Sequence, residues 1–351
     1  MRVVVIGQRP RVFGPDNFRW LAYTARALAR LNHRVTMVPL RESVAASPAL
    51  RQALRAFPQA IRRLARYEVA RRRRIERRLV RRIRRLRPDL VLVLNSESEV
   101  VSGETLAEIK RLTHGPLVAW WADDPWLYAP LVAHAPLFDH LFVFDRSYLP
   151  RLRALGARAH FLPCACDETV YQPVPLSAGD RRRFMCEVAF IGWYVPERGP
   201  VVSALGSQVD LKLWGGRWDT PAARAALSGT PVVPRPGVSD RTAVKIYSAS
   251  QIGLNVHHRQ SRFGGLNMRT FELLASGLFQ LVDRIPGLEE LLVPDQEVAC
   301  YTSPEEACAL AKRYLADPAA RARIASRGRA RVLDEHTYVA RMRTLCEVAR
   351  G

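Results

Sequence analysis

The residues best suited to bind a charged ligand lie in one stretch of the second half of the chain, residues 263–277. Gly264 and Gly265 let the backbone approach a ligand closely, and they precede an expected helix N-terminus, where free N–H groups favour phosphate. Arg269 would add a charge-assisted contact, and Glu272 shares its side of the helix, where a carboxylate can accept hydrogen bonds from two ribose hydroxyls. The pattern indicates a nucleotide site. The alternative is a glycine loop before a capped helix with an exposed glutamate.

Two adjacent carboxylates in the first half are candidates for acid–base work. Asp123 and Asp124 follow an expected strand and precede Pro125. Such a pair can orient or deprotonate a hydroxyl group of a second substrate. For Asp124 the alternative is an N-cap before a helix that starts with proline. His257 and His258 also follow a strand, so we expect one of them to reach the ligand, with an exposed surface pair as the alternative.

Several well-known motifs are missing from the sequence. It has no GxGxxG fingerprint after the first strand, no GxxxxGK[ST] loop and no GxSxG elbow, which argues against a standard dehydrogenase, a P-loop enzyme and a serine hydrolase. The six cysteines form no CxxC pair and no zinc spacing with histidine. We therefore predict no metal site and small buried cysteine side chains.

The order of apolar segments predicts the elements that position these residues. Short apolar runs alternate with helical patterns along the whole chain, which is typical of parallel α/β sheets. The expected strands are residues 2–6, 35–38, 90–94, 117–121, 141–144, 188–191, 209–213, 252–256 and 280–282. We expect two Rossmann-like domains, 1–180 and 181–335, with a helix at 336–351 that crosses back to the first. Ligands of such folds bind at the carboxyl ends of the strands.

The formal net charge of +21 over 351 residues is concentrated in two segments. Residues 51–87 hold 16 arginines and two glutamates, a net of +14, and residues 312–343 add a net of +6. We expect residues 51–87 to form an outer helix of the first domain. Docking on an anionic membrane surface is a second interpretation. Contact with an acidic macromolecule, including nucleic acid, is a third and less favoured one.

No apolar run reaches the roughly 18–20 residues that a membrane-spanning helix needs, and the N-terminus does not resemble a signal peptide. We therefore expect a cytoplasmic protein, with peripheral attachment to the inner membrane face as an option.

The motifs, taken together, resemble one enzyme family. The segment FELLASG, residues 271–277, followed by the strand residues LVD, resembles the donor-binding helix of GT-B glycosyltransferases. The whole set is most similar to the CgeB-like (spore maturation) glycosyltransferases, relatives of the group 1, family-4-type enzymes. The matching motifs are WWADDP at 120–125, FDR at 144–146, LPCA at 162–165, AFIG at 189–192 with Arg198, LNV at 254–256, NxRxFE at 267–272, and HTY at 336–338 with Arg341.

This resemblance implies a nucleotide diphosphate sugar, UDP-, GDP- or TDP-linked, held mainly by the C-terminal half. The N-terminal half would hold the acceptor, a glycan, lipid, protein or small molecule. Glu272 matches the glutamate that binds the ribose. The first glutamate of the family-4 pair is replaced by Gly264, so Asn267 and Arg269 would substitute for it. Arg198 would face the diphosphate.

The residue patterns and the family resemblance together predict the site residues. The expected catalytic residues are Asp123, Asp124, Arg198 and Arg269. The expected donor-binding residues are Gly192, Arg198, Trp214, Gly215, Asn255, His257, Gly264, Gly265, Asn267, Arg269 and Glu272. The resemblance further implies no permanently bound cofactor, no metal, and retention at the anomeric carbon. The remaining alternatives are a nucleotide-sugar epimerase or hydrolase, a non-catalytic nucleotide-binding module and a nucleic-acid-binding protein.

Overall fold

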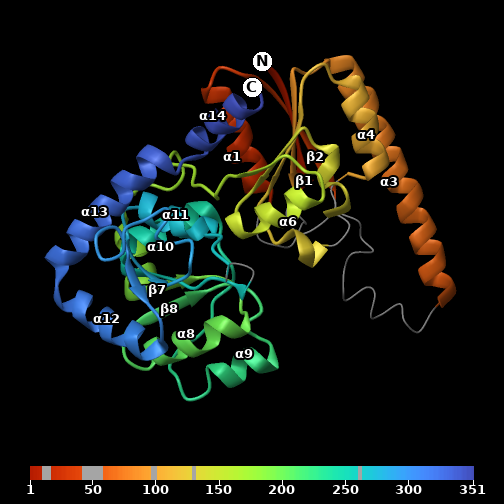
Figure 1. Ribbon diagram of the computed structural model, residues 1–351. Coiled ribbons are helices and arrows are strands. Elements are labelled where there is room, and N and C mark those ends of the chain that lie inside the picture. The colour runs from red at the N-terminus through yellow and green to blue at the C-terminus, as the bar shows by residue number, and fades with distance from the viewer. Residues whose placement is uncertain (10–16, 42–57, 96–100, 129–131, 260–262) are drawn as a thin grey trace. The chain divides into compact units, whose positions relative to one another are not determined.

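The computed structural model describes residues 1–9, 17–41, 58–95, 101–128, 132–259 and 263–351. The chain divides into two compact units. The first unit comprises Met1–Phe144, Tyr148–Leu162 and Met342–Gly351, and the second comprises Asp145–Ser147 and Pro163–Arg341. Each unit is built on its own parallel sheet (Figure 1).

The first unit contains a six-stranded parallel sheet in the order β2-β1-β3-β4-β5-β6. Its strands are β1 (Arg2–Arg9), β2 (Arg34–Arg41), β3 (Leu90–Asn95), β4 (Leu117–Trp121), β5 (His140–Val143) and β6 (Ala159–Phe161). The central strands are apolar along their length because helices cover both faces of the sheet.

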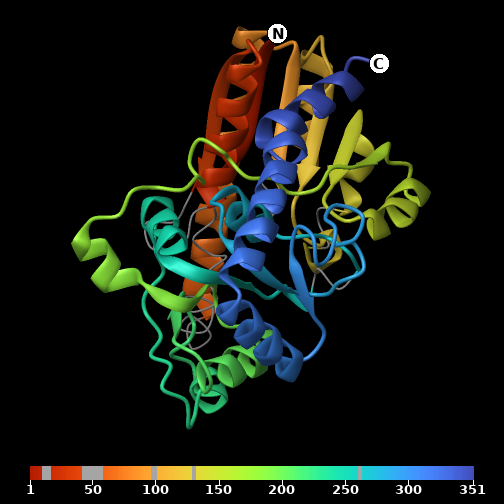
Figure 2. The ribbon, with the colours of Figure 1, turned by 90° about the vertical axis from the view of Figure 1, so that its left-hand side faces the viewer.

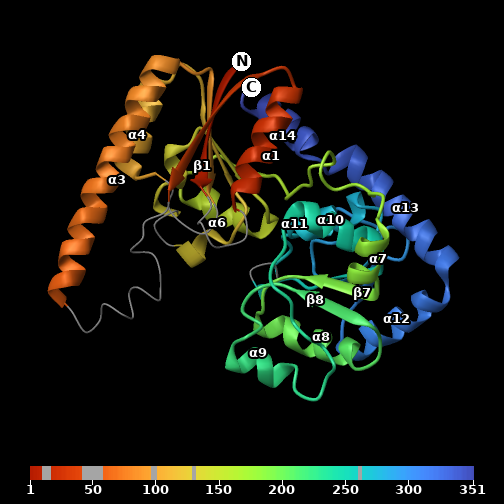
Figure 3. The ribbon, with the colours of Figure 1, turned by 180° about the vertical axis from the view of Figure 1, so that it is seen from behind.

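The helices of the first unit lie on the two sides of this sheet. They are α1 (Asn17–Arg30), α3 (Pro58–Leu86), α4 (Gly103–Leu112), α6 (Leu149–Ala154) and the end of α14 (Tyr338–Val348). Figures 1 and 3 show α1 and α14 on one side, and α3 with α4 on the other. Figure 2 shows both chain ends at the same end of this unit.

The predicted arginine-rich helix is present as α3, and residues 51–57 of the predicted segment lie outside the described residues. Leu79, Val80 and Ile83 of α3 are buried. The carboxylate of Glu76 accepts hydrogen bonds from the backbone N–H and the hydroxyl of Ser102, the N-cap of α4, at 2.8 and 3.0 Å. This links the C-terminal half of α3 to the start of α4.

The second unit contains a five-stranded parallel sheet in the order β11-β10-β9-β7-β8. Its strands are β7 (Cys186–Ile191), β8 (Leu211–Trp214), β9 (Ser250–Asn255), β10 (Phe279–Asp283) and β11 (Ala299–Tyr301). Its helices are α7 (Ala178–Phe184), α8 (Gly199–Gly206), α9 (Pro221–Ala226), α10 (Asp240–Ala249), α11 (Met268–Ala275), α12 (Pro304–Ala316) and α13 (Pro318–Glu335).

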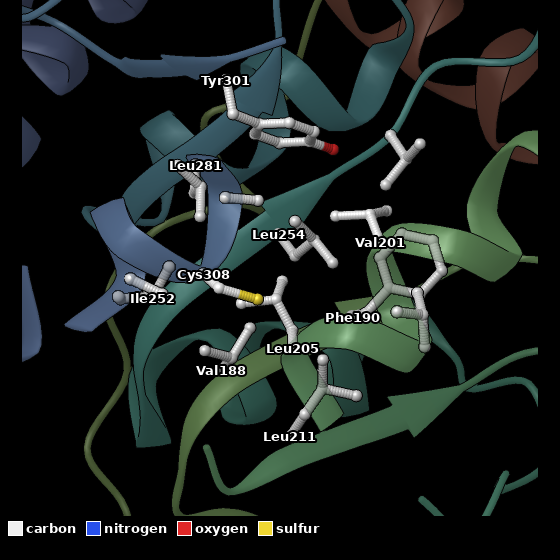
Figure 4. Packing of buried hydrophobic residues seen from close by; sticks show 14 of the residues in the cluster. Val188, Phe190, Val201, Leu205, Leu211, Ile252, Leu254, Leu281, Tyr301 and Cys308 are labelled. Carbon is white, nitrogen blue, oxygen red and sulfur yellow. The ribbon is translucent and has the colours of Figure 1, made fainter. Parts of the chain in front are cut away.

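Helices α8, α9 and α12 lie on one face of this sheet, and α10 and α11 lie on the other (Figures 1 and 3). The core between α8, α12 and the strands consists of apolar side chains from each element, including Val188, Phe190, Leu205 and Leu254 (Figure 4). The predicted α/β fold with two Rossmann-like parallel sheets and a helical C-terminus is therefore confirmed.

The long segment of the second unit begins at Pro163, whereas the sequence predicted a boundary at residue 181. The linker packs on α10: the Tyr171 hydroxyl donates to Asp240 at 2.9 Å, and the Val174 N–H donates to the Ser248 hydroxyl at 3.0 Å. These contacts make the proline-rich segment part of the second unit. None of the helices in the described ranges is long and apolar enough to cross a membrane.

Candidate functional site

The sequence-predicted donor residues gather at one edge of the second sheet. Because all five strands are parallel, their carboxyl ends meet at this edge. Gly192 follows β7, Asn255 ends β9, and Asp283 ends β10. Ligands of open α/β sheets bind at such an edge, so the residues found there form the candidate site.

Two guanidinium groups face the same glycine at this edge. Arg198 is buried, with 8% of its surface exposed, and donates to Trp193 O at 2.7 Å and Val256 O at 3.2 Å. Arg269 lies in the first turn of α11. A Cβ placed on Gly192 would lie 3.1 Å from Arg269 Nη2 and 3.3 Å from Arg198 Nη1. Gly192 therefore lets the backbone after β7 pack closely against two cations.

The electrostatics of this pair favour a bound anion. Both guanidinium groups lie over the Phe190 ring, at 5.7 Å for Arg198 and 5.5 Å for Arg269. Burial, and then the positive charge of Arg269, lower the pKa of Arg198 to about 9. Within the described ranges neither arginine forms an ion pair. A diphosphate bound by both arginines would offset both the desolvation and the repulsion.

A network of buried amides fixes the start of α11 on the sheet. Asn267 is the N-cap, and its carbonyl oxygen accepts from Thr270 N at 3.0 Å. Asn255 is fully buried; its amide nitrogen donates to Thr270 Oγ1 at 2.9 Å and Gln280 Oε1 at 3.1 Å. Its carbonyl oxygen accepts from Asn267 Nδ2 at 3.0 Å and from Arg269 Nη1 at 3.4 Å. The side chain of Asn255 is therefore used in positioning other residues of the site, including Asn267 and Arg269.

His257 is also part of the interior and not a surface residue. Its Nδ1 is 2.7 Å from Asp283 Oδ1, its backbone N–H donates to the same carboxylate, and its Nε2 lies 3.4 Å from Thr270 Oγ1. The expectation that His257 reaches a ligand directly therefore has no support from its orientation. Asp283 was not among the predicted site residues. Its position at the end of the strand segment LVD is the only feature of the sequence that points to it.

A buried aspartate positions the glycine loop before α11 by accepting a hydrogen bond from its backbone. Gly265 N–H donates to Asp145 Oδ2 at 2.8 Å, and Asp145 Oδ1 also accepts from Ser147 N at 2.9 Å. Gly264 has a φ of 138°, a conformation that favours glycine. A Cβ on Gly287 would lie 2.0 Å from Gly264 O. Gly264 and Gly287 thus allow the loop to pack closely, and the hydrogen bond to Asp145 fixes its position.

Trp214 and Gly215 follow β8 and contribute through their backbone. The Trp214 ring is buried, and the Arg235 guanidinium lies 5.3 Å from its centre. Gly192 N–H donates to Trp214 O at 2.8 Å, and a Cβ on Gly215 would lie 1.9 Å from Gly192 O. Gly215 therefore permits the close approach of the loops after β7 and β8.

Glu272 lies in α11 one turn after Arg269 and is mostly buried. Burial raises the pKa of Cys166, and the charges of Glu168 and Glu272 add to this effect, so Glu272 lies near the segment that opens the second unit. Its expected contact with a ribose stays a prediction.

The predicted acceptor residues belong to the first unit. Asp124 accepts a hydrogen bond from Trp126 N at 2.9 Å and caps the short turn Pro125–Tyr128, as its alternative interpretation predicted. Asp123 is half-buried after β4. The Trp126 ring is covered by the Arg151 guanidinium at 4.0 Å. A catalytic role for either aspartate stays a prediction.

The fold and the site define a class that known structures share, the GT-B fold. The chain is similar to HepE from Anabaena, solved in complex with UDP and glucose, with a TM-score of 0.65 and 14% identity over 100% of this chain and 99% of that one. It is similar to sucrose-phosphate synthase from Thermosynechococcus elongatus, with a TM-score of 0.64 and 14% identity over 99% and 98% of the chains.

A further similar structure is AviGT4, a glycosyltransferase involved in avilamycin A biosynthesis, with a TM-score of 0.62 and 16% identity over 99% of this chain and 97% of that one. Residues 198–347 match the family described as glycosyl transferase-like. No curated protein sequence matches the chain. The family match covers the part of the chain that holds Arg198, the amide network and α11.

Proposed function

We propose that the protein is a glycosyltransferase that moves a sugar from a nucleotide diphosphate sugar to a hydroxyl group of an acceptor. The observation that carries the proposal is the pair Arg198 and Arg269, two guanidinium groups that lie beside Gly192 at the N-terminus of α11. The family match over residues 198–347 supports the same reaction class. On the sequence motifs we assign the enzyme to the CgeB-like group.

In this proposal the acceptor oxygen forms a bond to the anomeric carbon while the bond to the donor phosphate oxygen breaks. The electron pair of the broken bond leaves with the nucleotide diphosphate, and the hydroxyl proton passes to a base, for which Asp123 is the candidate. Arg198 and Arg269 stabilise the negative charge that grows on the leaving diphosphate. Metal independence and retention of the anomeric configuration are proposed from the family resemblance alone.

Binding of the donor is the first test, because it separates this site from its alternatives. We expect calorimetry with UDP, GDP and TDP to detect binding of at least one nucleotide, and UDP is tried first because the HepE structures contain it. No binding of any nucleotide would contradict the proposal.

The ribose contact is tested with Glu272→Gln, which keeps the size of the side chain but removes its charge. The loss of charged hydrogen bonds, worth about 1.5–3 kcal/mol, corresponds to roughly 10- to 100-fold weaker binding of the preferred nucleotide. The control is Glu305→Gln, an exposed carboxylate in the first turn of α12. If the variant binds the nucleotide as tightly as the unchanged protein does, Glu272 does not contact the ribose.

Turnover then separates the remaining alternatives. A transferase releases nucleotide diphosphate from its donor faster when a hydroxyl-bearing acceptor is added. A hydrolase shows no such dependence, an epimerase releases no nucleotide, and a binding module leaves the donor intact. Acceptors from each candidate class, glycan, lipid, protein and small molecule, are added in turn. Cytoplasmic localisation stays a prediction.

A further inference from the structure

Helix α3 contains a run of described side chains that are not buried in the first unit. The helix has 29 residues, whereas its neighbour α4 has ten. Among its side chains that the structure describes, 66, 67 and 69–86, the buried ones are Glu76, Leu79, Val80 and Ile83. The described side chains from 66 to 74 are exposed or half-buried. Figure 1 shows the N-terminal half of α3 running past the end of α4.

The exposed half combines positive charge with apolar surface. We call residues 66–77 the basic arm. Its residues at spacings of three and four share one side of the helix. They are Arg66, Val69, Ala70, Arg73, Arg74 and Arg77. Val69 is 51% exposed, and Tyr67, two residues earlier, is 64% exposed. Exposed apolar surface therefore lies next to the exposed arginines.

Arg72 and Arg84 of α3 form ion pairs at or near the contact between α3 and α4. Arg72 pairs with Glu76 at 3.1 Å, and Arg84 lies 3.9 Å from Glu108 of α4. In contrast, Arg66, Arg73, Arg74 and Arg77 are all exposed. The basic arm therefore presents a concentration of positive charge to a partner outside the unit.

We propose that the basic arm docks the protein on an anionic membrane surface. A helix that lies in the membrane interface places arginines among lipid phosphates and apolar side chains at the acyl boundary. The basic arm has both kinds of side chain. A nucleic acid would engage the arginines through its phosphates but would leave Tyr67 and Val69 in water. Charge and exposed apolar surface together therefore favour lipid as the partner. This proposal does not depend on glycosyl transfer.

The test uses the full-length protein and vesicles of phosphatidylcholine, alone or mixed with phosphatidylglycerol. We expect co-sedimentation only with the anionic vesicles. Replacing Arg66, Arg73, Arg74 and Arg77 by Gln should weaken this binding roughly 100- to 1000-fold, since each basic residue near an anionic surface contributes about fivefold.

The matched control removes the same charge from exposed positions of α12 and α13. It replaces Lys312, Arg313, Arg323 and Arg327 by Gln. We expect this variant to bind the anionic vesicles as the unchanged protein does. Circular dichroism checks that both variants fold. Equal weakening in the two variants, or no weakening in the first, would overturn the proposal.

A second variant separates membrane from nucleic acid. Replacing Tyr67 and Val69 by Gln leaves the charge unchanged and keeps good helix formers. We expect roughly tenfold weaker vesicle binding, because the apolar contact with the acyl boundary is lost. Unchanged vesicle binding would overturn the proposal. Tighter arginine-dependent binding to duplex DNA than to anionic vesicles would replace it with a nucleic-acid surface.

Discussion

Arg198 is a charged residue kept in the interior next to another cation, which costs free energy in the absence of a ligand. Two backbone carbonyls accept its hydrogen bonds, but the pKa is still lowered to about 9 by burial and by Arg269. We expect Arg198→Met to weaken nucleotide diphosphate binding roughly 10- to 100-fold, the loss of a charge-assisted contact. Calorimetry measures this, with the exposed Arg323→Met of α13 as the control. An unchanged affinity would show that the diphosphate lies elsewhere.

Gly192 offers a separate test of the two guanidinium groups that pack beside it. An added methyl would lie 2.9 Å from the Phe190 ring and close to both arginines, so Gly192→Ala should displace them. We expect nucleotide binding to weaken about tenfold or more, beyond any loss of stability. At Gly216 an added methyl would meet only Trp193, at 3.9 Å, so Gly216→Ala is the control. Equal affinities of the two variants would argue against a nucleotide contact by these arginines.

The position of helix α11 depends on the amide network at its N-terminus. Asn255→Ala leaves the buried groups of Gln280 and Thr270 without their shared donor. We expect the free energy of unfolding to fall by roughly 2–3 kcal/mol, because several buried polar groups lose a partner. Urea denaturation measures it. Asn267→Ser, which keeps an N-cap oxygen, should cost less than about 1 kcal/mol. A similar loss in both variants would mean that the network does not act through Asn255.

Strands with an apolar run of four or more residues could be predicted from the sequence, and three-residue strands could not. The strands expected at 90–94 and 117–121 match β3 and β4 closely. Strands β6 and β11, of three residues each, have no period to detect and exist because they extend an existing sheet.

The same limit applies to the candidate site. Asn255 and His257 could be selected as candidates because they are polar residues at a strand end. The orientations of their side chains depend on Gln280 and Asp283, respectively, which are distant in sequence. Only the fold decides whether such a side chain points to a ligand or into the interior.

At the scale of the whole molecule, the chain passes between the two units at Phe144–Asp145, Ser147–Tyr148, Leu162–Pro163 and Arg341–Met342. Within the second unit, a hydrogen bond connects Pro163 with Arg341, the residues at which the last two of these passages lie. Buried Arg341 donates to Pro163 O at 3.0 Å and to Glu335 O at 2.7 Å, and its Nη2 lies 2.7 Å from His336 Nδ1. His336 Nε2 lies 3.0 Å from Leu291 O. The histidine therefore fits this place as a neutral ring that accepts at Nδ1 and donates at Nε2.

This arrangement makes stability depend on pH. Burial, and then the charge of Arg341, lower the pKa of His336 to about 4, whereas an unfolded histidine titrates near 6.5. The unfolded state therefore binds more protons between these values, and the free energy of unfolding falls as the pH drops from about 6.5 towards 4. From pH 7 to pH 5 the contribution of His336 is roughly 2 kcal/mol. Urea denaturation of the unchanged protein and of His336→Gln at both pH values isolates it, because other histidines contribute equally to both. We expect the variant to lose less stability on acidification. A pH dependence identical to that of the unchanged protein would mean that His336 is already protonated in the folded chain, and that Arg341 does not hold the crossing in the way its hydrogen bonds indicate.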